Sequence, residues 1–267
     1  MLSNTSRYLT YLTAVLYAIL GAMLFAIPEQ LAPVFAWKVT AFMTMTIGGW
    51  CLGNAWLAFF AARRWKWEKV FTSLLYLGLF GIGELLVLYF FREKLSLKHP
   101  IAWLYLITLL ANVALAVFAF TDLIRMRPQF ESPESKTSSL IYALLVLFII
   151  FVGYLGVYGC IAQIGWPATN GEIFPEVMSL FTLRSFGVFY LCIALAVTPF
   201  LKYRSWNAIL NHGFLSYGLI IFITAAAFVY IRLFDFAAHP GGLLYFGAYL
   251  AVGAPLLFVF WKHGTGS

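Results

Sequence analysis

Residues 92–105 read Arg-Glu-Lys-Leu-Ser-Leu-Lys-His-Pro-Ile-Ala-Trp-Leu-Tyr, and residues 232–245 read Arg-Leu-Phe-Asp-Phe-Ala-Ala-His-Pro-Gly-Gly-Leu-Leu-Tyr. The two stretches share five residue types at one constant spacing, and each joins two long apolar runs. The matched residues are Arg92 and Arg232, His99 and His239, Pro100 and Pro240, Leu104 and Leu244, and Tyr105 and Tyr245. The match predicts that the chain holds two tandem copies of one membrane unit.

The composition places this unit in a bilayer. The chain has 267 residues, of which 63% are hydrophobic and 10% are charged, whereas a soluble globular chain is nearer half apolar and a quarter charged. Its apolar runs have the length of about 20 residues that a helix needs to cross a bilayer core. We therefore expect an all-α integral membrane protein with eight transmembrane helices. The expected spans are 8–27, 39–61, 70–91, 101–124, 140–163, 179–200, 207–230 and 241–261.

One long polar connection lies between the fourth and fifth spans. Segment 126–139 contains two prolines and many Ser, Thr and Glu residues, a composition typical of a flexible linker. We predict a first four-helix repeat at 1–125, a cytoplasmic linker at 126–139 and a second four-helix repeat at 140–267. Because each repeat has an even number of spans, the two copies should be parallel, with the same orientation in the membrane.

The positive residues set the orientation. Of the 17 Lys and Arg residues, eleven fall on the side of the two termini and five on the other side. Cytoplasmic loops carry the excess of positive charge, so we expect both termini in the cytoplasm, in a bacterial inner membrane. The Lys and Arg residues are in short loops between spans, where they set the orientation of the protein in the membrane. The net charge of +7 therefore does not indicate binding of nucleic acid.

Two charges lie within the expected hydrocarbon region, Glu84 in the third span and Arg184 in the sixth. Buried ionisable groups of this kind mark a function or a partner. At 1.5 Å per residue they lie about 10 Å and about 8 Å below the same membrane surface. When the two copies are aligned, Thr46 occupies the position of Arg184, and Thr224 occupies the position of Glu84. We expect Glu84 and Arg184 either to form an ion pair between the copies, which could serve packing alone, or to face one polar cavity.

The residues around the opening match give a second candidate site. Proline suits the first turn of a helix, so each His-Pro pair can simply begin a span. The alternative is a paired site on the extracytoplasmic face, joining His99 to Arg92 and His239 to Arg232 or Asp235. Carboxylates are sparse around His99, so we expect no metal there. The histidines also offer no pair at one depth for haem.

Aromatic residues make up 19% of the chain. They could line a slot for a lipid, a quinone or a carotenoid, although such side chains more often pack helices or face lipid. We predict no other cofactor. Gly48, Gly49 and Gly53 indicate a close helix contact through small residues, which Asn54 and Asn112 could bridge by hydrogen bonds.

The sequence carries no catalytic motif such as GxSxG, a Walker loop or HExxH, so we lean against an enzyme. We expect a non-enzymatic subunit or a lipid- or pigment-binding scaffold of a membrane complex, with membrane lipids and other membrane subunits as partners. Two alternatives remain open. One is a small transporter with a cavity at Glu84 and Arg184. The other is a membrane enzyme for an isoprenoid- or sterol-like substrate, with Glu84 as the acid and base.

Overall fold

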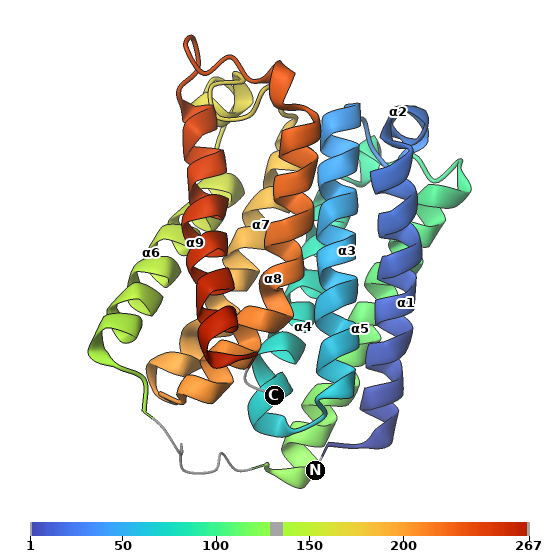
Figure 1. The fold of residues 1–267 in the computed structure, drawn as a ribbon. Helices are drawn as coiled ribbons and strands as arrows, with labels where there is room; N and C mark the ends of the chain where they lie inside the picture. Colours follow the sequence, from blue (N-terminus) through green and yellow to red (C-terminus); the bar gives the residue numbers. More distant parts are fainter. Residues whose placement is uncertain (1, 129–135, 266–267) are drawn as a thin grey trace.

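The chain forms a helical bundle in a computed structural model that describes residues 2–128 and 136–265 (Figure 1). Eight of the helices in these two ranges are long and apolar enough to cross a membrane, and no β-strand occurs in them. The prediction of an all-helical membrane bundle is therefore confirmed. The α-helices are α1 (Asn4–Ala26), α2 (Pro28–Leu31), α3 (Ala41–Arg63), α4 (Trp67–Phe90), α5 (Pro100–Met126), α6 (Ser139–Ile161), α7 (Leu180–Val197), α8 (Trp206–Val229) and α9 (Gly241–His263).

Hydroxyl side chains begin most of the long helices. In each case the side chain of the residue before the helix accepts a hydrogen bond from a backbone N–H of the first turn, which would otherwise have no partner. These N-cap residues are Ser3, Thr40, Ser138, Ser179 and Ser205. The expected helix start at the first His-Pro pair is confirmed, since Pro100 is the first residue of α5. The second helix begins one residue later, at Gly241 after Pro240.

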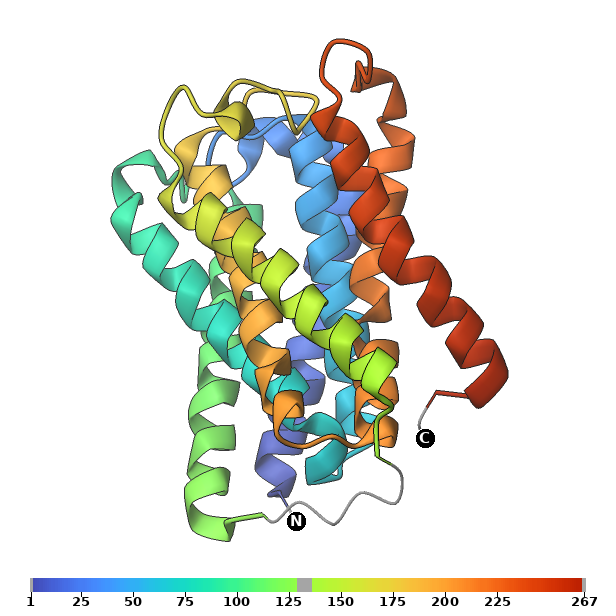
Figure 2. The same ribbon diagram turned by 90° about the vertical axis from the view of Figure 1, so that its left-hand side faces the viewer.

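The two halves of the chain meet along the middle of the bundle. Helix α3 packs against α8, and α4 packs against α7 and α8. Helices α6 and α9 lie at the periphery; they slant in the same direction in Figure 2, and their lower ends diverge in Figure 1. Helix α1 begins, and α9 ends, at the end of the bundle drawn lowest in Figure 1. We call the opposite end, which carries α2, the upper end.

Aromatic contacts join the halves in a reciprocal pattern. Phe42 packs edge-on against Tyr230 with ring centroids 5.8 Å apart, and Phe91 stacks on Phe181 at 5.1 Å. Near the middle of the bundle Trp50 stacks on Phe189 at 4.7 Å. The Tyr230 hydroxyl lies outside the spanning segments and donates to Glu29. Burial, followed by the neighbouring Glu29 carboxylate, raises the pKa of Tyr230 to about 12, so this hydroxyl stays a donor at neutral pH.

Glycines allow the closest helix crossings. A Cβ atom added to Gly187 of α7 would lie 2.5 Å from the backbone N of Cys160 in α6. One added to Gly48 of α3 would lie 2.7 Å from the backbone N of Phe25 in α1. Gly49 and Gly53 approach the backbone of α8 in the same way. The predicted close contacts through small residues in the second span are therefore present, and they join α3 to both of its neighbours.

The predicted spans differ from the observed helices by a few residues at each end. The largest difference is in the first span, where α1 begins at Asn4 rather than at residue 8. In the sixth span α7 ends at Val197, and a 3₁₀ turn follows at Thr198–Leu201. Most of the predicted linker, residues 129–135, lies outside the described residues. At its far end the backbone N–H of Thr137 donates to the carbonyl of Arg204 at 3.0 Å.

Candidate functional site

Glu84 lies fully buried between the two halves. It is on α4, and its exposed fraction is 0%. The Tyr105 hydroxyl of α5 donates to Glu84 Oε2 at 3.1 Å, while Oε1 has no hydrogen-bond partner. The Ser185 hydroxyl of α7 approaches the same carboxyl group but does not reach hydrogen-bonding geometry, and its Oγ is also without a partner. The carboxyl group therefore joins α4 to α5 and lies beside α7 of the second half.

Further buried polar side chains continue this site along the first half. The amide of Asn112 donates to the Tyr17 hydroxyl at 3.1 Å and to a backbone carbonyl of α4. The Tyr76 hydroxyl donates to Asn54 Oδ1 at 2.9 Å. The expected hydrogen bonding by Asn54 and Asn112 is present, although each binds a tyrosine rather than the other asparagine. These hydroxyls had no signal in the sequence, because tyrosine is common in apolar helices.

Arg184 has partners other than Glu84. Its guanidinium donates to the carbonyl oxygens of Gly159 at 2.7 Å and Ala162 at 2.6 Å. These carbonyls are at the C-terminal end of α6, where the last helical carbonyls lack intrahelical partners and a cation interacts favourably with the helix dipole. No ion pair between Glu84 and Arg184 occurs in the described ranges. Cys160 of α6 is near both side chains, which are therefore in the same upper part of the bundle.

The two threonines aligned with these charges are both within the bundle. Thr46 is buried, and its hydroxyl donates to the Phe42 carbonyl at 2.9 Å within its own helix. The Tyr245 hydroxyl approaches Thr46 without reaching hydrogen-bonding geometry. The Thr224 hydroxyl has no partner. The second half thus has the Thr224 hydroxyl at the position aligned with the Glu84 carboxyl group of the first half.

An apolar cavity opens beside Tyr105 at the upper end of the first half. Its volume is about 240 Å³. A backbone hydrogen bond from Ser96 to Ala36 (2.8 Å) and a bond from the Trp103 indole to the Leu97 carbonyl (2.8 Å) fold the connecting segment over α4 and α5. We call this cavity the first-half pocket. It is lined by Ala36, Leu85, Leu88, Tyr89, Arg92, Leu95, Leu97, Ala102, Tyr105 and Leu106.

Arg92 is the one charged side chain among the residues that line the first-half pocket. It is exposed, and its guanidinium lies 5.1 Å from the centre of the Tyr89 ring. His99, its predicted partner, is exposed before α5 without a side-chain cap hydrogen bond. The two side chains form no hydrogen bond with each other within the described part of the chain.

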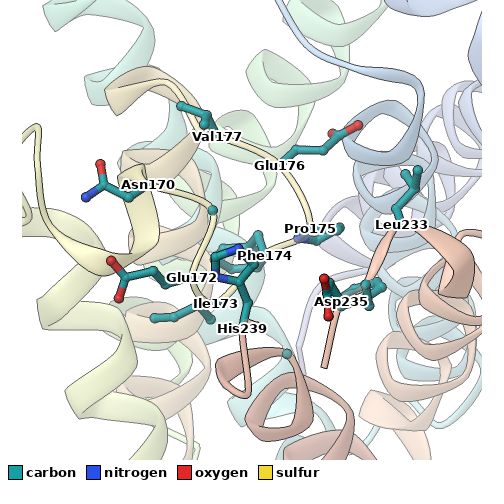
Figure 3. A pocket seen from close by; sticks show the side chains of 13 residues that line it. Asn170, Glu172, Ile173, Phe174, Pro175, Glu176, Val177, Leu233, Asp235 and His239 are labelled. Carbon is teal, nitrogen blue, oxygen red and sulfur yellow. The ribbon is translucent and has the colours of Figure 1, made fainter. Parts of the chain in front are cut away.

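A second pocket, of about 160 Å³, lies at the upper end of the second half. Figure 3 shows Glu172, Asp235 and His239 around it. Asp235 Oδ1 accepts backbone hydrogen bonds from the two alanines that follow it, and the His239 backbone N–H donates to the Asp235 carbonyl at 2.8 Å. Arg232 is exposed and does not line this second-half pocket. The predicted residues Asp235 and His239 are therefore neighbours, whereas Arg232 is apart from them.

No group of three or more His, Cys, Asp or Glu side chains that could hold a metal occurs in residues 2–128 and 136–265. The three cysteines are free, and Cys51 and Cys192 are buried.

Another buried polar contact lies at the lower end and was not predicted. His212 of α8 shares a hydrogen bond of 2.8 Å with Thr72 of α4. Its neighbour Asn211 accepts from Arg64 at 2.7 Å and donates to the Lys69 carbonyl at 2.7 Å. Arg64 lies just beyond α3, where burial and then the charge of Arg63 lower its pKa. This cluster ties α8 to the connection between α3 and α4.

Comparison with known proteins adds no relative: no family model, no curated protein and no solved structure matches the chain.

Proposed function

We propose that the protein is a non-enzymatic membrane protein that holds an amphiphile with an anionic head in the first-half pocket. The observation that carries this proposal is the lining of that pocket, which is apolar apart from the hydroxyls of Tyr89 and Tyr105 and from Arg92 at its exposed edge. An apolar tail would lie against the leucines, and the guanidinium would bind a phosphate or carboxylate head with charge-assisted hydrogen bonds. A phospholipid and a prenyl phosphate share this chemistry.

The size of the pocket supports partial enclosure of such a ligand. Pockets that enclose a whole drug-sized ligand have volumes of about 300–1,000 Å³, whereas this one has about 240 Å³. It would hold the segment of the amphiphile next to the head, while the rest of the tail lies in the bilayer. The position at the end of α4 suits this arrangement, because headgroups lie at the ends of spanning helices.

The closed surroundings of Glu84 favour binding over transport or catalysis. Glu84 is fully buried, and neither of the two pockets is lined by Glu84 or Arg184. A transporter or an enzyme that used Glu84 would need a path for water or substrate to the carboxyl group. The one observation that favours the enzyme alternative is the position of Tyr105, which lines the pocket and donates to Glu84. A Glu84→Gln variant that still binds the amphiphile would support the non-enzymatic proposal.

We also propose that the bundle is two tandem, parallel four-helix repeats. An offset of 139 residues, one less than in the opening match, relates Phe42 to Phe181, and the same offset relates Phe91 to Tyr230. Their contacts, Phe42 on Tyr230 and Phe181 on Phe91, are the reciprocal pairs that two-fold symmetry produces. Trp50 and Phe189 have the same offset and stack on each other, as expected of equivalent residues next to the axis.

The orientation and the partners follow from the same proposal. The excess of positive residues at the lower end supports a cytoplasmic location for both termini, in a bacterial inner membrane, with the first-half pocket on the extracytoplasmic side. Helices α6 and α9 are buried over only 11% and 17% of their most apolar segments. These helices offer the largest apolar surfaces to lipid or to another subunit of a membrane complex.

Purification in a mild detergent followed by native mass spectrometry tests the binding proposal. The wild-type protein should carry an anionic amphiphile, and Arg92→Gln should weaken its retention about tenfold, because a hydrogen bond to a charged group contributes about 1.5–3 kcal/mol. Lys94→Gln is the matched control, since Lys94 is exposed on the same turn and does not line the pocket. Equal retention by the wild type and Arg92→Gln would overturn the proposal.

A further inference from the structure

We propose that Glu84 is a proton-binding site at the contact between the two halves, and that it carries a proton at neutral pH. In this state Oε1–H donates to Ser185 Oγ while Oε2 accepts from the Tyr105 hydroxyl. The bond to Ser185 then links α4 of the first half to α7 of the second. The proposal is independent of whether an amphiphile occupies the first-half pocket.

Charge, rather than the number of hydrogen bonds, decides the protonation state. Both hydroxyls can rotate, so an ionised carboxylate could also accept from Tyr105 and Ser185. An ionised carboxylate within the hydrocarbon region is costly unless a cation pairs with it. Among the described residues no cation pairs with Glu84, and Arg184 donates to the end of α6 instead. The neutral acid can keep the bond from Tyr105 and form the bond to Ser185 without that cost.

The groups that face Glu84 from the surrounding helices supply no positive charge. They are tyrosines and cysteines, which are neutral when protonated. An ionised form of any of them would add a negative charge beside the carboxyl group. These titratable neighbours are Tyr17 of α1, Cys51 of α3, Tyr105 of α5, Cys160 of α6 and Cys192 of α7.

Asp122 provides an internal contrast. It accepts three hydrogen bonds at the lower end of the bundle, from the Ser3 backbone N–H (3.0 Å), the Ser3 hydroxyl (2.7 Å) and the Ser6 hydroxyl (2.6 Å). Arg125 adds a favourable charge. A carboxylate with several donors and a nearby cation stays ionised. Of these two carboxyl groups, only Glu84 lacks such stabilisation of its charge.

Release of the proton would change the contact between the halves. The resulting carboxylate would favour hydration, and separation of α4 from α7 would let water reach it. Binding and release of a proton at Glu84 would therefore favour a closed and a more open arrangement of the halves, respectively. The ligand of this site is the proton itself, and the moving element is the α4–α7 contact.

Infrared spectroscopy of the purified protein at neutral pH tests the proposal through the carbonyl stretch of a protonated carboxylic acid. The wild type should show this band, and Glu84→Gln should lose it. Glu68→Gln, in the first turn of α4, is the matched control and should keep it. Ser185→Ala should shift the band to higher frequency, because one hydrogen bond is lost, whereas Ser73→Ala should leave it unchanged.

A wild-type protein without the band, or a band that persists in Glu84→Gln, would overturn the proposal. If Glu84→Gln does not fold, the shift of the band in Ser185→Ala tests the proposal by itself. An unshifted band in that variant would contradict the proposed bond from Glu84 to Ser185. Neither result depends on retention of the amphiphile, so this test and that of the proposed function can fail separately.

Discussion

The upper ends of the two halves share a framework but differ in chemistry. In the first half Tyr105 donates to the buried Glu84 and borders an apolar pocket. In the second half Tyr245, its counterpart in the repeated stretch, donates to nothing within hydrogen-bonding geometry. Leu95 lines the first pocket, and Asp235, 140 positions later, lines the second. The repeated His-Pro stretch thus builds the connection between two helices in each half, whereas the residues that vary around it give the two pockets different linings.

The largest effect should come from the helix crossings that the halves share. Gly187→Val should destabilise the protein by about 3 kcal/mol or more, since the new side chain has no room against α6. Gly48→Val should cost slightly less, because a Cβ atom there would lie 2.7 Å from its nearest backbone atom, rather than 2.5 Å as at Gly187. Unfolding in mixed detergent micelles measures both. Gly247→Ala is the control, with no atom within 4 Å of its Cβ, and an equal loss there would contradict the account.

The next-largest difference in stability between the two halves should come from removal of the Glu84 carboxyl group. Glu84→Ala should cost about 2 kcal/mol, because it leaves a cavity and removes the partner of the buried Tyr105 hydroxyl. Thr224→Ala, in the corresponding region of the second half, should cost close to nothing, since the Thr224 hydroxyl has no partner to lose. The same micelle unfolding measures the pair. Equal losses would mean that the first half has no special polar site.

Removal of the hydroxyls of Tyr105 and Tyr245 should give a smaller difference in the free energy of unfolding, again with the larger loss in the first half. Tyr105→Phe should cost about 1 kcal/mol, the typical contribution of one hydrogen bond. Tyr245→Phe should leave the free energy of unfolding unchanged, because its hydroxyl lacks a hydrogen bond in the second half. A larger loss for Tyr245→Phe would reverse the comparison and would assign the more important hydroxyl to the second half.

The smallest effect concerns the coupling between Glu84 and Arg184. A double-mutant cycle with Glu84→Gln and Arg184→Gln should give a coupling energy below about 0.5 kcal/mol, as for residues without shared partners. Each side chain has its own partners, Tyr105 for Glu84 and the end of α6 for Arg184. A coupling above about 1 kcal/mol would restore the ion pair that the sequence suggested.

The sequence predicted the helices better than the contacts between them. The apolar runs and the His-Pro pair before α5 carry local signals, so the eight spans could be found within a few residues. Glu84 could be recognised as buried because a single charge in the middle of a long apolar run is costly in lipid and therefore faces the bundle interior. Its neighbours Tyr105 and Ser185 could not, because tyrosine and serine are ordinary residues in membrane helices.

Arg184 shows why the pairing was not predictable. Its partners are the backbone carbonyls of Gly159 and Ala162, and every residue has such a carbonyl. Only the end of α6 beside α7 makes these two available. The first-half pocket was unpredictable for a similar reason, since it depends on the backbone bond from Ser96 to Ala36, which joins distant segments without a side-chain signal.

The retention of an anionic amphiphile by a protein with a filled first-half pocket tests the central claim most directly. Leu106 lines that pocket and is half-buried, whereas the adjacent Ile107 is exposed and does not line it. Native mass spectrometry of Leu106→Trp should show the amphiphile largely lost, and Ile107→Trp should retain it at the wild-type level. Full retention by Leu106→Trp, or absence of any amphiphile from the wild type, would contradict the account.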